Sequence, residues 1–318
     1  MTTPPFRPTR TRAVRFDRYG GREVLTVGEV DLPELGPGEV LVQIRAAGIN
    51  PGEAIIRSGL LHDRLPATFP SGQGTDLAGV VVETAADVSA FVAGDEVLGF
   101  SWARSSHAGH VVVPAPQLIA KPKALSWEVA GALDVAGTTA YAAVRAVRVQ
   151  PGDVVAVSAA TGGVGTLVVQ LLVRHGARVL GIASSTNADW LVAHEVTPIE
   201  YGDGLEDRLR AAAPDGIDAF IDLFGPGYVR LAARLGVPTD RINTIVVSDA
   251  AVELATRMDG AGALTFDEAH GALGELADAL AAGTIELPIA ATYPLDRVVD
   301  AFEELERRHS FGKIVLVP

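Results

Sequence analysis

The chain has 318 residues, enough for one large or two medium-sized domains with a sizeable buried core. A net charge of −13 argues against a generic nucleic-acid surface, and the lack of cysteine excludes disulfides, thiolate zinc sites and a cysteine nucleophile. No apolar run is long enough to span a membrane. The N-terminal segment MTTPPFRPTRTR predicts a loose tail rather than a secretory signal. We therefore predict a cytoplasmic protein that binds neither nucleic acid nor membranes.

The first third of the chain predicts short β-strands separated by Gly and Pro turns. Residues 40–47 alternate between apolar and other side chains, as a half-buried strand does. The pattern favours a compact, partly open β-barrel. The expected strands are Arg12–Phe16, Val24–Val30, Val40–Ala47, Val80–Glu83, Glu96–Phe100 and His110–Val113.

After Lys121-Pro122 the composition changes, and helical and strand-like segments alternate. Such alternation predicts an α/β domain with a doubly wound parallel sheet. The expected helices are Trp127–Leu133, Thr138–Val147, Phe266–Ala282 and Leu295–Arg308. The expected strands are Val154–Val157, Arg178–Ala183, Pro198–Tyr201, Ala219–Leu223, Ile242–Val247 and Lys313–Val317. We assign the C-terminal segment to the first domain, so that residues 1–122 and 287–318 form one domain and residues 123–286 the other.

A glycine turn connects the first strand of this second domain to the helix that follows it. The turn reads AxxGxxG from Ala159 to Gly165, and apolar residues then recur at helical spacing. Gly162 and Gly163 allow backbone positions that a Cβ would block, and Gly165 allows the helix to pack closely on the strand. This βαβ layout typically holds a dinucleotide pyrophosphate at the helix N-terminus. A structural turn in an α/β domain without a ligand is the alternative.

Six segments, in order along nearly the whole chain, resemble motifs of one family. They are AAGINP at 46–51, GTDLAGVV at 74–81, FVAGDEV at 91–97, VAGTTAY at 135–141, ATGGVG at 160–165 and GKIVL at 312–316. Together they resemble the zinc-independent medium-chain dehydrogenase/reductases, and in particular their NADPH-dependent, quinone oxidoreductase-like branch. The resemblance implies a GroES-like catalytic domain, a Rossmann domain and an active site in the cleft between them. It also implies an enzyme that often forms homodimers or homotetramers.

The resemblance also identifies three positions that bind catalytic zinc in the alcohol dehydrogenase branch. Here they hold Asn50, Thr75 and Val135, an amide, a hydroxyl and an alkyl group that cannot form a zinc site. His107 and His110 are three residues apart, but we interpret them as loop residues rather than ligands. We therefore predict that the protein holds no metal.

The end of the second strand of the βαβ unit indicates the cofactor. The stretch from Ser184 to Asn187 contains no carboxylate that would bind an adenosine 2′-hydroxyl and repel a 2′-phosphate, which favours NADPH over NADH. The sequence lacks the Lys or Arg that many relatives carry there. Tyr201 resembles a tyrosine beside the 2′-phosphate, although strand-end packing explains it equally well. The predicted cofactor contacts, several of them implied only by the resemblance, are Thr138, Ala160, Thr161, Gly162, Gly163, Val164, Gly165, Ser184, Ser185, Asn187, Tyr201, Phe224, Val246, Phe311 and Lys313.

Asn50 and Thr138 are the predicted catalytic residues, each with a structural alternative as a turn-forming or helix-capping side chain. The predicted substrate pocket contains Asn50, Glu53, Phe100, Trp102 and Asp134. Glu53 either orients Asn50 or faces solvent. Asp134 would become a proton donor if burial raised its pKa, but a solvated carboxylate at a helix start is the favoured interpretation. Phe100 and Trp102 either line the pocket or pack elsewhere.

These observations predict an NADPH-dependent reductase of quinones or α,β-unsaturated carbonyl compounds. Without a metal to polarise the substrate, the hydride acceptor has to be a carbon that is already activated. Two alternatives remain at this point. One is a dinucleotide-binding sensor or partner protein without turnover, and the other is a biosynthetic reductase with one dedicated substrate.

Overall fold

The computed structural model describes residues 7–307 and 310–318, which form two compact units. The first unit contains the chain up to Val135 together with Gly274–Thr284 and Ile289–Pro318, and the second contains Ala136–Leu273 and Ile285–Pro288. The boundaries that we predicted lie at residues 122 and 286. Residues 1–6 of the expected tail and Arg308, the expected last residue of a helix, lie outside the described residues.

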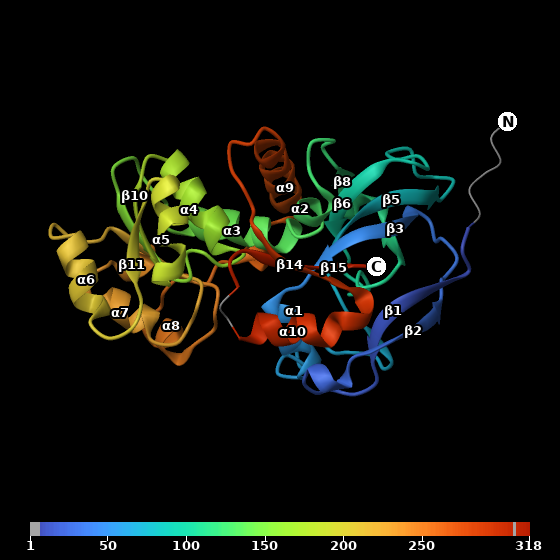
Figure 1. Ribbon diagram of the computed structural model, residues 1–318, viewed down its shortest axis with the longest axis horizontal. Helices are drawn as coiled ribbons and strands as arrows, with labels where there is room; N and C mark the ends of the chain where they lie inside the picture. Colours follow the sequence, from blue (N-terminus) through green and yellow to red (C-terminus); the bar gives the residue numbers. More distant parts are fainter. Residues whose placement is uncertain (1–6, 308–309) are drawn as a thin grey trace. The chain divides into compact units, whose positions relative to one another are not determined.

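The first unit is built mainly of β-strands. One sheet has the strand order β2-β1-β4, and a larger one has the order β14-β15-β3-β5-β6-β8, with β7 also pairing with β3. The C-terminal strands therefore lie beside the N-terminal strand β3 (Figure 1). The strands are β1 Arg10–Phe16, β2 Thr26–Asp31, β3 Glu39–Gly48, β4 Ser71–Gly72, β5 Asp76–Thr84, β6 Glu96–Phe100, β7 His110–Pro114, β8 Leu118–Ala120, β14 Ile289–Pro294 and β15 Lys313–Val317.

Residues of β3 on one face form the core of this unit, as the sequence predicted, but Leu41 of the other face is fully buried as well. Val40, Val42 and Ile44 belong to one buried cluster. The expected strand Val24–Val30 begins only at Thr26, because residues 22–24 form a short 3₁₀ turn. The helices of this part of the chain are α1 Pro51–Arg57, α2 Trp127–Ala130 and α10 Val298–Glu306.

The second unit is a Rossmann-like parallel sheet with the strand order β11-β10-β9-β12-β13. The chain proceeds from β9 to β11 in one direction and then returns to the other side of β9, and ligands bind at the carboxyl ends of strands at such a switch point. The strands are β9 Val154–Val157, β10 Arg178–Ala183, β11 Val196–Glu200, β12 Ala219–Asp222 and β13 Ile242–Thr244. The helices are α3 Asp134–Ala146, α4 Gly165–Arg174, α5 Ala188–Ala193, α6 Leu205–Ala212, α7 Tyr228–Arg234, α8 Asp249–Glu253 and α9 Phe266–Ala281; α3 begins in the first unit and α9 ends there.

Helices cover both faces of this sheet. Leu180 and Phe220 belong to a buried cluster that includes residues of α6 and α7. Gly181 points to the opposite face, where a Cβ would lie 3.2 Å from Leu191 of α5. The prediction of a strand over 242–247 was too long, because Val246 donates its N–H to the Thr244 hydroxyl instead of to a neighbouring strand.

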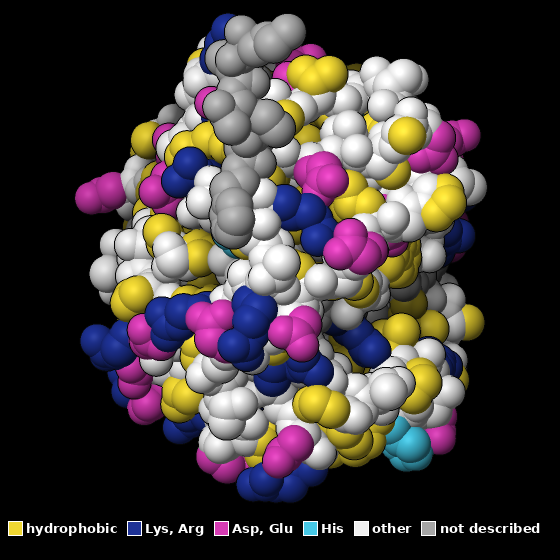
Figure 2. All heavy atoms as spheres, turned by 90° about the vertical axis from the view of Figure 1, so that its right-hand side faces the viewer, with side chains coloured by type: hydrophobic (Ala, Val, Ile, Leu, Met, Phe, Trp, Pro, Cys, Tyr) yellow, Lys and Arg dark blue, Asp and Glu magenta, His cyan; other side chains and the backbone are white. Residues whose placement is uncertain are grey.

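The surface carries charged side chains of both signs (Figure 2), as a sequence with 26 Lys and Arg and 39 Asp and Glu residues predicts. On the face shown in Figure 2, acidic and basic side chains are interspersed rather than gathered into patches of one sign. Within residues 7–307 and 310–318, no helix is both long enough and apolar enough to cross a membrane.

Candidate functional site

One candidate site, for the cofactor, is the turn between β9 and α4 in the second unit. The left-handed backbone conformation of this turn falls on Ala159, with φ of 48°, and not on Gly162 or Gly163. Gly162 donates its N–H to the Ala159 carbonyl at 2.9 Å. A Cβ on Gly165 would lie 2.1 Å from that carbonyl oxygen, so only glycine allows α4 to begin so close to the strand. The N-terminus of α4 therefore lies close to the end of β9, where a Rossmann unit holds a dinucleotide pyrophosphate.

Polar side chains gather where β10 ends. The Ser184 hydroxyl accepts the Thr186 N–H at 3.3 Å, and Asn187 donates to the hydroxyl of Thr161 at 3.3 Å. The second bond joins two of the predicted cofactor contacts, one from each loop. These hydroxyl and amide groups can donate hydrogen bonds to a phosphate.

The next strand, β11, ends beside this cluster, because Ala183 of β10 is paired with Glu200. Tyr201 follows, and 45% of its surface is exposed. Arg208 of α6 donates to the carbonyl oxygens of Glu200 at 2.8 Å and Tyr201 at 3.3 Å. The stretch Ser184–Asn187 after β10 contains no basic residue. Arg208 instead reaches the neighbouring end of β11 from α6, further along the chain.

Asp222 orders the loops after β12 and β13. Its carboxylate is fully buried, accepts the hydroxyls of Ser158 at 2.7 Å and Thr244 at 2.9 Å, and also accepts the backbone N–H of Phe224 at 3.0 Å. A Cβ on Gly225 would lie 2.9 Å from Val246. The predicted contacts Phe224 and Val246 are thus close together at this end of the sheet. The prediction missed the role of Asp222, which a lone carboxylate at the end of an apolar strand could have indicated.

A separate candidate site is a buried polar network in the first unit. Asn50 lies between β3 and α1, and Glu53 lies in the first turn of α1. One Glu53 oxygen accepts the Thr75 hydroxyl at 2.8 Å and the Thr75 N–H at 3.0 Å, and the other accepts the Asn50 N–H at 3.2 Å. Glu53 is only 5% exposed. The alternative that Glu53 faces solvent was therefore wrong.

A buried cation completes this network. The Lys313 ammonium donates to Asn50 Oδ1 at 2.5 Å and to the Ile49 carbonyl at 3.2 Å, and it lies 3.5 Å from Asp76 Oδ2. Asn50 Nδ2 donates to the same Asp76 oxygen at 3.0 Å. We predicted Lys313 only as a cofactor contact, and we assigned Asp76 no role. A charged residue directly before the apolar run of residues 77–82 in β5 was the available signal for Asp76.

The network brings a second carboxyl close to Asp76. Asp134 is half-buried at the start of α3, and Asp76 accepts the N–H of the next residue, Val135, at 2.8 Å. Burial, followed by the charge of Asp76, raises the pKa of Asp134 to about 8. Asp134 does begin a helix, but the favoured interpretation of a solvated carboxylate with an ordinary pKa was wrong. At neutral pH it holds a proton.

The remaining residues singled out from the sequence lie in loops, strands and helices of both units. His107 is in a loop, as predicted, but it is fully buried, and its Nε2 lies 3.7 Å from Glu53 Oε2. Phe100 and Trp102 form an edge-to-face pair with centroids 5.0 Å apart, and Trp102 is 69% exposed. Thr138 is buried in the part of α3 that belongs to the second unit, and Phe311 is half-buried just before β15. In the described parts of the chain, no group of three His, Asp or Glu side chains could hold a metal ion.

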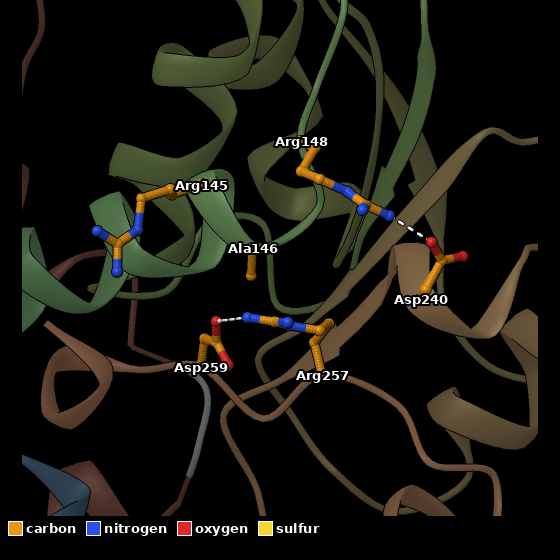
Figure 3. Close-up of a pocket in the computed structure, with 6 residues that line it drawn as sticks. All are labelled: Arg145, Ala146, Arg148, Asp240, Arg257 and Asp259. Atoms are coloured by element: carbon orange, nitrogen blue, oxygen red, sulfur yellow. Dashed lines mark hydrogen bonds and ion pairs between the residues drawn. The ribbon is translucent and has the colours of Figure 1, made fainter.

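A separate surface pocket of about 270 Å³ lies in the second unit. Figure 3 shows that Arg148 points to Asp240 and Arg257 to Asp259 across it. Its charges are thus largely paired within the protein, and it contains none of the predicted site residues. The remaining lining residues are Arg145 and Ala146.

Comparisons with known proteins agree with this architecture. Residues 36–123 match the family model described as an alcohol dehydrogenase GroES-like domain, and residues 187–316 match the one described as a zinc-binding dehydrogenase. The quinone oxidoreductase of Rattus norvegicus is 30% identical over 319 residues, which cover 95% of each chain. The human mitochondrial NAD(P)H oxidoreductase RTN4IP1 is 29% identical over 99% of this chain and 91% of its own.

Solved structures show the same similarity. The quinone oxidoreductase from Coxiella burnetii is 29% identical, with a TM-score of 0.87 over 97% of this chain and 99% of that one. The Escherichia coli quinone oxidoreductase complexed with NADPH shares the fold, with 24% identity and a TM-score of 0.78 over 96% of this chain and 100% of its own. The chain therefore belongs to the medium-chain dehydrogenase/reductase superfamily and is a quinone oxidoreductase-like NAD(P)H oxidoreductase.

Proposed function

We propose that the protein is a zinc-independent, NADPH-dependent reductase that delivers a hydride to a quinone or to the β-carbon of an α,β-unsaturated carbonyl compound. The observation that carries this proposal is the contact between Lys313 and Asn50. Asn50 stands at one of the three positions that bind zinc in the alcohol dehydrogenase branch, and the Lys313 ammonium lies 2.5 Å from its amide oxygen. This positive charge would repel a metal cation there. Because no metal ion polarises the substrate, the carbon that accepts the hydride has to be already activated by the acceptor's own chemical structure.

The residues of the second unit suit NADPH. Gly165 allows α4 to begin close to β9, as in dinucleotide-binding turns, and no carboxylate follows β10 before Asp189. The hydroxyl of Ser184, the amide of Asn187 and the guanidinium of Arg208 favour a 2′-phosphate over a bare ribose hydroxyl. Bound NADPH supplies the hydride, and the protein supplies orientation and proton donors.

Two residues of the first unit are suited to the acceptor. Asn50 can donate an amide N–H to the oxygen on which negative charge develops. Asp134, which is protonated at neutral pH, can give its proton to the reduced product and recover one from water. Asp76 connects these two residues, because it accepts one hydrogen bond from Asn50 and another from Val135, the residue after Asp134. Asn50 and Asp134 therefore belong to the same network.

The proposal is tested by measuring NADPH oxidation with a panel of quinones, enones and 2-enoyl thioesters. We expect turnover that depends on the acceptor, that a metal chelator leaves unchanged, and that has a higher kcat/KM with NADPH than with NADH. Tight NADPH binding without hydride transfer to any acceptor would instead identify a sensor or partner protein. Turnover with a single member of the panel would indicate a dedicated biosynthetic reductase.

Assembly and location are further parts of this proposal. We expect a homodimer or homotetramer, which light scattering of the purified protein would detect. The lack of cysteine fits a reducing compartment such as the cytoplasm.

A further inference from the structure

Lys313 is a buried cation with three fixed acceptors. Its side chain is 6% exposed, and its ammonium points to Asn50 Oδ1, the Ile49 carbonyl and Asp76 Oδ2. An ammonium has three N–H donors, so each donor has one acceptor in this arrangement. A buried ammonium persists only when it is paired in this way.

The two charges around Asn50 select one orientation of its amide. Its oxygen faces the Lys313 ammonium at 2.5 Å, and its nitrogen faces the Asp76 carboxylate at 3.0 Å. The flipped amide would point NH₂ at an ammonium and oxygen at a carboxylate, and both contacts would be repulsive. Lys313 and Asp76 therefore fix the donor direction of Asn50.

One of the two Asn50 N–H groups has only long contacts. After the bond to Asp76, the acceptors nearest to Nδ2 are the Thr75 hydroxyl at 3.4 Å and Glu53 Oε1 at 3.5 Å. That Glu53 oxygen already accepts both the hydroxyl and the N–H of Thr75 at 3.0 Å or less. A carbonyl oxygen at an ordinary distance of about 2.9 Å would make a better partner.

We infer that Lys313 is a positioning residue for the reduction: its ammonium, anchored by Asp76, holds Asn50 so that the second amide N–H faces the carbonyl oxygen of the acceptor. Donation to the Asn50 oxygen also polarises the amide and strengthens that N–H as a donor. The inference rests on the proposed function, and it assigns Lys313 to the acceptor side of the reaction rather than to the cofactor.

The first test replaces Lys313 by Met and, as a matched control, by Arg. We expect Lys313→Met to lower kcat about 30-fold and to leave the dissociation constant for NADPH within about twofold of the wild-type value, since the interaction strengthens where the oxyanion develops. Lys313→Arg keeps the charge and should recover most of the lost kcat. A large rise in the NADPH dissociation constant at unchanged kcat would overturn the inference, because it would make Lys313 a cofactor contact.

A second test separates positioning from stability, because removing one partner of a buried ion pair leaves the other charge uncompensated and destabilises the protein. The double variant Lys313→Met with Asp76→Asn removes both charges and should melt closer to the wild type than Lys313→Met alone. Its kcat should nevertheless stay low. Recovery of kcat together with the melting temperature would show that Lys313 is only structural.

A third measurement does not depend on turnover. In ¹⁵N–¹H spectra of the protein without ligand, we expect the two side-chain amide protons of Asn50 to be widely separated in the wild type and in Lys313→Arg, and close together in Lys313→Met. Unchanged Asn50 signals in Lys313→Met would overturn the inference even if the protein reduced none of the acceptors. A wild type without turnover but with these expected signals would contradict the proposed function alone.

Discussion

The carboxylate of Asp76 accepts the backbone N–H of Val135 at 2.8 Å and thereby joins the start of β5 to the first turn of α3. Those two residues are 59 positions apart in the chain. Because Asp134 immediately precedes Val135, the bond also holds two carboxyl groups near each other. Asp76 also faces the Lys313 ammonium at 3.5 Å, whereas burial and the charge of Asp76 raise the pKa of Asp134 to about 8.

Replacing Asp134 by Asn should stabilise the protein at alkaline pH but not at acid pH. The pKa of Asp134 rises from 3.8 to about 8 on folding, whereas the unfolded chain ionises this group near its ordinary value. The folded wild type therefore loses stability as the pH rises from about 4 to about 8, and the neutral amide of the variant removes this loss. We expect the variant to melt about 3–6 °C above the wild type at pH 9 and within about 1 °C of it at pH 4.

The same variant tests Asp134 as a proton donor. Wild-type kcat should fall above about pH 8, where the carboxyl loses its proton, and Asp134→Asn should lower kcat at pH 7 about 100-fold. Asp63→Asn is the control, because the Asp63 side chain is 88% exposed and should affect neither property. An unchanged pH profile of kcat in Asp134→Asn would show that water protonates the product.

Ser184→Asp should reverse the cofactor preference. It introduces a carboxylate at the end of β10, where the second strand of a Rossmann unit meets the adenosine ribose. We expect NADPH to bind at least about tenfold more weakly and NADH to bind as well as before, as measured by fluorescence titration. Ser184→Asn, similar in shape but neutral, is the control. Equal losses for both cofactors in Ser184→Asp would place the 2′-phosphate elsewhere.

Gly165→Ala should abolish nucleotide binding. The new methyl group would lie 2.1 Å from the Ala159 carbonyl oxygen, so α4 would have to move away from β9. We expect loss of detectable NADPH binding by calorimetry and a loss of stability of about 2 kcal/mol. Gly274→Ala in α9 is the control, since no atom lies within 4 Å of the added methyl group and the helix should gain slightly. Wild-type affinity in Gly165→Ala would contradict the assignment of this turn.

Ala159→Gly should stabilise the second unit. A left-handed conformation costs an L-residue about 1–2 kcal/mol, and glycine avoids that cost while losing about 0.5–1 kcal/mol through the freedom of the unfolded chain. The expected net gain is about 0.5–1 kcal/mol in denaturant unfolding. Ala279→Gly, in the helix α9, should instead destabilise by about 1 kcal/mol. A similar loss in Ala159→Gly would mean that the methyl group packs usefully in the turn.

The sequence predicted the elements whose signals are local. Alternation along β3 and the glycine turn before α4 depend on neighbouring residues, and the structure confirms both. The network around Asn50 could not be predicted in the same way. Its members come from the start of α1, from β5 and from β15, so only tertiary contacts reveal that Lys313 faces Asn50. Burial likewise decided the pKa of Asp134, which no local pattern encodes.

The pairing of β15 has a consequence for biosynthesis. Ala47 and Gly48, at the end of β3 shortly before Asn50, pair with Leu316 and Val315, and the ammonium that orients Asn50 belongs to Lys313. The second unit, by contrast, is complete once Pro288 has been synthesised. Strands β14 and β15 follow the second unit in the chain, so the first unit completes its larger sheet only after the whole of the second unit has been synthesised.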